Sequence, residues 1–121
     1  MTDHLELGKQ GEFIAINYLM AKGYTILDTN WKFGKNEIDI IARDGKWLVI
    51  AEVKTRHSNF FAEPETSVTR EKQRILVRAA NGYVRYKHLN YEVRFDVIAI
   101  LVGPDGEQIK HIADAFYPTL Y

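Results

Sequence analysis

The sequence predicts a mixed α/β domain whose sheet of roughly five strands is flanked by helices. Three observations support this fold class. Residues 5–22 and 69–87 repeat apolar side chains at helical spacing. Short runs of strand-forming residues lie between these segments and after them. Asp44-Gly45 separates two of the runs, and Asp-Gly is a strong signal for a two-residue hairpin. The resulting order αβββαββ favours a mixed sheet.

The first half of the chain is expected to contain one helix and three strands. The helix covers residues 5–22, and Gly23 ends it because glycine tolerates the left-handed conformation that follows a helix. A first strand follows at residues 24–31. The hairpin supplies the second and third strands at residues 38–42 and 47–51.

The second half is expected to contain a loop, a helix and two strands. Residues 55–66 form the loop, and Thr69 caps a helix that runs to about Lys87. The core stripe of this helix consists of Ile75, Leu76, Ala79, Ala80 and Tyr83. Residues 94–102 and 108–113 form the last two strands.

Composition limits the class of protein. With 121 residues, the chain is expected to form a single domain over residues 1–121. It has no run of about 18 apolar residues, so we expect no membrane-spanning helix, and its first residues lack a signal-peptide pattern. The absence of cysteine excludes disulfides and thiolate metal sites. These features predict a cytoplasmic protein.

The formal net charge of zero conceals a basic segment. Between Thr69 and His88 the only acid is Glu71, and the cations are Arg70, Lys72, Arg74, Arg78, Arg85 and Lys87. The fourfold spacing of Arg70, Arg74 and Arg78 would suit a phosphate backbone. A solvated helical face is the commoner explanation for such a stripe.

Two acids and a lysine interrupt the apolar hairpin strands: Asp39, Glu52 and Lys54. Such side chains are seldom buried unless they are paired or bound to metal. If Asp44-Gly45 is the turn, Asp39 faces Ile50 and Glu37 faces Glu52. Asp39 and Glu52 then share one face with Lys54, as diagonal neighbours roughly 7–8 Å apart at the backbone.

These carboxylates predict a divalent-metal site. Their hard oxygen ligands suit Mg²⁺ or Mn²⁺. Such a cation polarises a phosphoryl oxygen and lowers the pKa of a bound water, and Lys54 would orient that water or stabilise charge on the phosphate. The alternative is a structural ion pair of Lys54 with Glu52 or Asp39 at a solvated strand end.

Other polar residues have two interpretations. Glu12 would reach the metal directly or through water, or is a favourable acid near a helix N-terminus. Glu37 is a solvated edge residue, or a cation relieves its repulsion from Glu52. Thr55, Arg56 and Gln73 would contact the substrate, or lie at the plain surface. Asp96, another acid in an apolar strand, is expected to pair with Arg94 or with a cation of the second helix.

With Glu12, Asp39, Glu52 and Lys54 in place, the chain resembles the PD-(D/E)XK nuclease superfamily. More closely it resembles the YraN family of small bacterial proteins, itself similar to archaeal Holliday-junction resolvases. The matching segments cover most of the chain and include residues 8–12, 37–44, 52–56, 68–73 and 94–97. Two departures from the family pattern are Asn36, where glycine is usual, and the segment at residues 61–64.

The resemblance implies a restriction-endonuclease-like, three-layer core. It implies that Asp39, Glu52 and the Val53 carbonyl hold Mg²⁺ or Mn²⁺, that Glu12 assists, and that Lys54 is the catalytic lysine. The implied activity is hydrolysis of phosphodiester bonds in DNA, including branched DNA. A homodimer is also implied, since a junction presents two symmetric strands. Two alternatives remain open: a non-catalytic nucleic-acid-binding module and an interaction protein that retains the nuclease fold.

Overall fold

A computed structural model describes residues 3–57 and 68–117 of the chain. The elements in these residues follow the predicted order αβββαββ, which is confirmed. They are α1 (Asp3–Ala21), β1 (Thr25–Phe33), β2 (Asn36–Asp44), β3 (Trp47–His57), α2 (Arg70–Lys87), β4 (Glu92–Gly103) and β5 (Gly106–Phe116).

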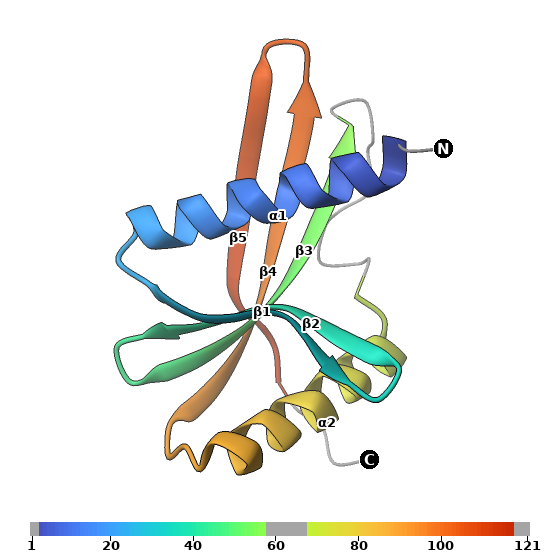
Figure 1. Cartoon of the computed structure of the whole chain (residues 1–121). Helices are drawn as coiled ribbons and strands as arrows, with labels where there is room; N and C mark the ends of the chain where they lie inside the picture. The colour runs from blue at the N-terminus through green and yellow to red at the C-terminus, as the bar shows by residue number, and fades with distance from the viewer. Residues whose placement is uncertain (1–2, 58–67, 118–121) are drawn as a thin grey trace.

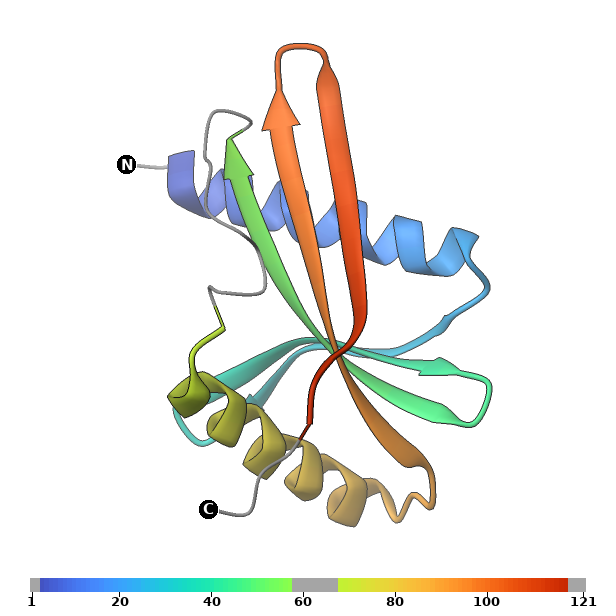
Figure 2. The same ribbon diagram turned by 180° about the vertical axis from the view of Figure 1, so that it is seen from behind.

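The strands form one mixed sheet in the order β1-β2-β3-β4-β5. Only β3 and β4 pair in parallel, and the other neighbours are antiparallel. The parallel pair follows from the connection, because the chain returns to the same end of the sheet through α2. The two helices lie on opposite faces of the sheet, and Figures 1 and 2 show them from both sides.

Each helix covers its own hydrophobic core. On the α1 face, Ala15 and Leu19 pack with buried residues of β2, β3 and β4. On the α2 face, Leu76 and Tyr83 pack with the opposite side chains of the same strands. The central strands are therefore buried on both faces, which explains their nearly continuous apolar runs. Neither helix of the described residues is long and apolar enough to cross a membrane.

Capping contacts confirm the predicted roles of Gly23 and Thr69, although α1 spans Asp3–Ala21 where residues 5–22 were predicted. The N–H of Gly23 donates to the Met20 carbonyl at 3.0 Å, and Gly23 has a φ of +93°. Thr69 precedes α2, and its Oγ1 accepts a hydrogen bond from the Lys72 N–H at 3.1 Å. Of the predicted core stripe of α2, four residues are buried and Ile75 is half-buried.

The predicted loop at residues 55–66 begins too early. The strand β3 continues through Thr55 and Arg56 to His57, where these residues pair with β4. Residues 58–66, including the family departure at 61–64, lie outside the described residues. At Asn36, the other departure, the residue with left-handed geometry is the nearby Gly34, and Asn36 pairs with Phe33.

The turn between β2 and β3 consists of Gly45 and Lys46, because Asp44 pairs with Trp47. The predicted Asp44-Gly45 turn is therefore wrong by one position. Gly45 has a φ of +58°, and a glycine with positive φ in the first loop position is typical of a type II′ hairpin turn.

This turn shifts the pairing of β2 with β3 by two residues from the prediction. Ile41 lies opposite Ile50, whereas the prediction placed Asp39 opposite Ile50. The ladder ends one pair later, at Ile40 and Ala51. A shift of two residues preserves the alternation of faces within the paired segment.

Beyond the last pair, β2 and β3 separate. The beginning of β2 runs with β1 toward α2, while the end of β3 continues beside β4 and past α1 (Figure 1). Glu37 therefore does not face Glu52, and that prediction is wrong. Ile38 and Ile41 both pack in the α2-side core, so strict alternation is broken at the intervening Asp39.

Gly11 allows α1 to lie directly against β3. Gly11 is buried, and a Cβ atom placed on it would lie 1.8 Å from the Thr55 Oγ1 and 2.8 Å from the Thr55 Cβ. Rotation of the Thr55 side chain would not remove the second clash. Because Glu12 is the next residue of α1, this close contact sets the position from which Glu12 enters the neighbouring pocket.

Substitution of two glycines on α1 tests this contact. Gly11→Ala is expected to lower the free energy of unfolding by about 1–3 kcal/mol, because α1 must move away from β3. Gly8→Ala is the matched control: a Cβ there meets no atom within 4 Å, and we expect a gain of about 0.5–1 kcal/mol from helix propensity. Urea denaturation measures the free energy of unfolding of both variants. Equal changes in the two would contradict a steric role for Gly11.

Candidate functional site

Asp39 occupies the gap where β2 leaves β3. Its Oδ2 accepts a hydrogen bond from the Val53 N–H at 2.8 Å. In a continuous ladder this amide would donate to a carbonyl of β2, but the ladder has ended at Ile40 and Ala51. The carboxylate thus satisfies a backbone donor that the separating strand leaves behind.

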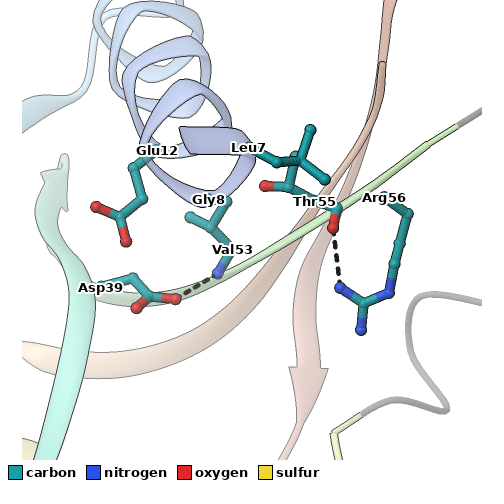
Figure 3. Close-up of a pocket in the computed structure, with 7 residues that line it drawn as sticks. All are labelled: Leu7, Gly8, Glu12, Asp39, Val53, Thr55 and Arg56. Atoms are coloured by element: carbon teal, nitrogen blue, oxygen red, sulfur yellow. Dashed lines mark hydrogen bonds between the residues drawn. The ribbon is translucent and has the colours of Figure 1, made fainter. Parts of the chain in front are cut away.

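A pocket of about 220 Å³ opens beside this hydrogen bond. It is lined by residues of α1, β2 and β3: Leu7, Gly8, Glu12, Asp39, Val53, Thr55 and Arg56. Figure 3 shows the carboxylates of Glu12 and Asp39 side by side, with the Arg56 guanidinium beyond Thr55. The Arg56 Nη1 donates to the Thr55 carbonyl at 2.9 Å. Helix α1 therefore brings Glu12 next to Asp39 of the sheet.

Asn30 joins Glu12 to a further acid, Glu37. Its Nδ2 donates to the Oε1 of Glu12 at 3.1 Å and to the Oε1 of Glu37 at 3.0 Å. Asn30 has a φ of +51°, a conformation that asparagine adopts more readily than most residues. Lys32 forms an ion pair with the other oxygen of Glu37. Carboxylate oxygens of Glu12, Glu37 and Asp39 lie within 4.8 Å of one another.

Glu52 completes the carboxylate site, a name we use for Glu12, Glu37, Asp39 and Glu52. Only 5% of Glu52 is exposed, and its Oε1 has no hydrogen-bond partner among the described residues. Its Oε2 lies 3.6 Å from the Lys54 Nζ and 3.7 Å from the Lys72 Nζ. Glu52 thus meets α2, whereas Asp39 reaches the pocket beneath α1. The predicted diagonal register is wrong, because Ile40 pairs with Ala51, but the Asp39 and Glu52 carboxyl groups are adjacent.

Asp96 on the neighbouring strand β4 shows what a fully paired buried acid looks like in this fold. It accepts two hydrogen bonds from Arg94, each at 2.9 Å, one from the Asp114 N–H and one from His111. Burial would raise the pKa of Asp96, but the hydrogen bonds from His111 and Arg94 outweigh it and lower that pKa. The predicted pairing with Arg94 is confirmed.

Asp39 shows the opposite electrostatic behaviour. Burial raises the pKa of the Asp39 carboxyl well above its usual range, and the charge of the adjacent Glu52 raises it further. The hydrogen bond from the Val53 N–H opposes this shift without cancelling it. Two adjacent acids, Glu52 buried and Asp39 partly buried, of which Asp39 resists ionisation, are an arrangement that a bound cation would stabilise.

The structure brings most of the predicted site residues together and separates one group. Glu12, Asp39, Val53, Thr55 and Arg56 line one pocket, and Lys54 lies beside Glu52. The predicted arginine stripe is exposed on α2, opposite the helix face that is buried against the sheet. This stripe consists of Arg70, Arg74 and Arg78. The Gln73 Nε2 donates to the Val68 carbonyl at the start of α2.

Sequence reasoning missed several contacts of the site. Asn30, Lys32 and Lys72 received no site role, and Glu37 was predicted to face a different residue. The contacts of Asn30 and Lys32 follow from the pairing of β1 with β2, which places Lys32 opposite Glu37. No local signal marked Asn30, because β1 also contains Asp28, Thr29 and Lys32 and has no buried position. The contact of Lys72 with Glu52 depends on how α2 packs against the sheet, and no local sequence pattern specifies this packing.

The donor set fits a hard divalent cation. All four acids offer oxygen, and no cysteine exists in the chain. The buried Glu52 Oε1 supplies the strongest indication, because no N–H or hydroxyl of the described residues donates to it. Its remaining partners are the proton of the adjacent Asp39 carboxyl or a bound cation. Glu12, Glu37 and Asp39 have oxygens close enough to share such an ion. Glu52, adjacent to Asp39, would contribute from the other side.

Comparison with known proteins identifies relatives along nearly the whole chain. The family model of the Uncharacterised protein family UPF0102 matches residues 11–100. A UPF0102 protein of Christiangramia forsetii is 47% identical over 97% of this chain and 98% of its own. One from Flavobacterium psychrophilum is 48% identical over the same shares. One from Thermodesulfovibrio yellowstonii is 49% identical over 93% of this chain and 97% of its own.

The two buried acids should respond differently to neutral substitution. Asp96→Asn is expected to lower the free energy of unfolding by about 3–5 kcal/mol, because Arg94 and His111 lose a buried acceptor. Glu52→Gln, measured without divalent cations, is expected to leave it unchanged or raise it by up to about 2 kcal/mol. Its lysine partners are partly exposed and can turn to solvent. Denaturant titration measures both, and comparable losses would show that Glu52 is a structural acid.

The raised pKa of Asp39 predicts a pH dependence of stability. The folded chain holds the Asp39 proton in a pH range where the unfolded chain has lost it. The free energy of unfolding should therefore decrease as pH rises above the ordinary aspartate pKa toward the raised one. Asp39→Asn should remove this decrease. Urea unfolding between about pH 5 and about pH 9 tests it, and a slope unchanged in the variant would refute the assignment to Asp39.

Proposed function

We propose that this chain, which belongs to the Uncharacterised protein family UPF0102, is a divalent-cation-dependent nuclease that hydrolyses phosphodiester bonds of DNA. The family is the YraN family that the sequence resembles. Branched DNA is the substrate class that its likeness to Holliday-junction resolvases implies. The same likeness implies a homodimer.

The observation that carries the proposal is the unpartnered Glu52 Oε1, seen against Asp96. Both acids are buried on adjacent strands, yet Asp96 receives a full set of donors and Glu52 does not. A buried acceptor without a partner destabilises the fold, so a ligand is the natural explanation for keeping one. Asp39 lies next to Glu52 and has a raised pKa, so a cation bound between the two carboxylates would replace the proton that Asp39 otherwise retains.

Within this proposal the residues have separate roles. Asp39 and Glu52, with the Val53 carbonyl, would hold Mg²⁺ or Mn²⁺, and Glu12 would contribute directly or through water. When bound, such an ion polarises a phosphoryl oxygen and lowers the pKa of a water molecule. Lys54, 3.6 Å from Glu52, would orient the attacking water and stabilise the negative charge that develops on the phosphate.

The arrangement of elements supports placement in the PD-(D/E)XK superfamily. The order αβββαββ and the separation of β2 from β3 at the acids agree with a restriction-endonuclease-like, three-layer core. Thr55 and Arg56 would contact the DNA strand that is cut, since both line the pocket. The arginine stripe and Gln73 would contact only DNA that extends around α2.

A second function has its own supporting observation. An interaction protein, or a binding module without cleavage, would use these charges as structural ion pairs. Glu52 does lie near Lys54 and Lys72, and Glu37 is paired with Lys32. Such a protein would gain no stability from Mn²⁺, whereas a metal site saturated at about one hundred times its Kd gains about 2.7 kcal/mol.

Cleavage of a DNA panel tests the proposal. Purified protein would be incubated with Mn²⁺ or Mg²⁺ and with labelled duplex, single-stranded, flapped and four-way DNA. We expect cleavage by the wild type that Asp39→Ala and Glu52→Ala both abolish. Asp105→Ala, which removes an exposed acid in the β4–β5 turn, should cleave like the wild type.

The other outcomes are equally informative. Cleavage that survives in both variants would indicate a contaminant or a misplaced site. Binding without cleavage, together with Mn²⁺ stabilisation, would favour a binding module. A thermal unfolding midpoint that Mn²⁺ leaves unchanged in the wild type would reject the metal site and favour the interaction protein.

A further inference from the structure

Lys72 is a second lysine at Glu52, in addition to Lys54. Its Nζ lies 3.7 Å from the Glu52 Oε2, and the Lys54 Nζ lies 3.6 Å from the same atom. The two ammonium groups approach from different elements, Lys54 from β3 and Lys72 from the first turn of α2. Both distances exceed the usual range of about 2.7–3.2 Å for a hydrogen bond, so both contacts are Coulombic.

The paired acid on β4 shows how loosely Lys72 is held. Asp96 is paired with Arg94, which contacts it at 2.9 Å and has 11% of its side chain exposed, and with His111 at 2.7 Å. Lys72 keeps 34% of its side chain exposed and makes no close contact with Glu52. A lysine retained only to neutralise Glu52 would be expected to lie closer and deeper, as Arg94 does.

The position of Lys72 in α2 is also unfavourable for the helix itself. Positive charge near a helix N-terminus opposes the helix dipole, and acids are preferred there. The first turn of α2 nevertheless contains Arg70 and Lys72 and a single acid, Glu71. Of these two cations, Lys72 is the one that contacts Glu52 of the carboxylate site.

Lys72 influences both sides of the gap between the separating strands. The pKa of Glu37 on β2 is lowered, mainly by hydrogen bonds from Lys32 and Asn30, and the charge of Lys72 adds to this effect. Lys72 also contacts Glu52 on β3. Its ammonium therefore lies near acids of both separating strands.

We propose that Lys72 is a substrate-binding residue whose ammonium group holds a phosphate of the nucleic acid at the carboxylate site. This inference rests on the proposed function. With Glu52 engaged by a cation, the Lys72 ammonium loses the one ion pair that it forms within the described residues. A phosphate oxygen is then its natural counter-ion. The role differs from that of Lys54, which lies on the strand of Glu52 and serves the attacking water.

The test is DNA affinity in Ca²⁺, which prefers the same oxygen ligands as Mg²⁺. Fluorescence anisotropy with a labelled oligonucleotide would compare wild type, Lys72→Gln and Lys72→Arg. Lys46→Gln is the charge-matched control, because Lys46 is an exposed lysine in the β2–β3 turn. We expect Lys72→Gln to bind about tenfold more weakly, and its slope of log affinity against log salt to be smaller by about one. Lys72→Arg should restore most of the affinity, and Lys46→Gln should match the wild type.

A second readout separates phosphate binding from structural support. Removing Lys72 leaves the carboxylate site more negative, so the Mn²⁺ concentration that gives half of the thermal stabilisation should be unchanged or lower in Lys72→Gln. Loss of both Mn²⁺ and DNA binding would overturn the inference in favour of structural support. Wild-type DNA affinity and salt slope in Lys72→Gln would overturn it while leaving the proposed nuclease intact. A wild type that binds no DNA would overturn both.

Discussion

The site depends on the point where two antiparallel strands stop pairing. After Ile40 and Ala51 the ladder between β2 and β3 ends, and the Val53 N–H faces the gap. A backbone donor inside a sheet needs an acceptor, and Asp39 supplies one from its side chain. An ordinary ladder would have used a neutral carbonyl. The use of a carboxyl group instead places a second ionisable acid in the sheet beside Glu52, and the other charged groups of the site are arranged around these two acids.

Those groups come from elements that reach the gap along different routes. α1 supplies Glu12 because Gly11 lets the helix touch β3, and β1 supplies Asn30, whose amide joins Glu12 to Glu37. α2 supplies Lys72. The site therefore forms only when both helices have docked on their own faces of the sheet. Local opening of either helix would disrupt it while most of the sheet remained folded.

The sequence predicted the elements better than it predicted how their side chains meet. Helical periodicity and the caps at Gly23 and Thr69 are local signals, and the structure agrees with them to within a few residues. The hairpin turn was displaced because Asp-Gly fits two loop positions, and a local pattern does not choose between them. The acids were identified as unusual from their apolar surroundings. Lys72 required knowledge of how α2 packs, which is a long-range property.

The hydrogen bond between Val53 and Asp39 also gives the molecule a natural reporter of its site. Amide protons of a strand normally exchange with solvent when the ladder opens, so their rates report on the sheet. The Val53 proton is held by a side chain instead. Its exchange rate follows the charge and position of one carboxylate, while the amides of the paired residues nearby supply the baseline. One backbone resonance of the unsubstituted protein therefore records what happens to Asp39.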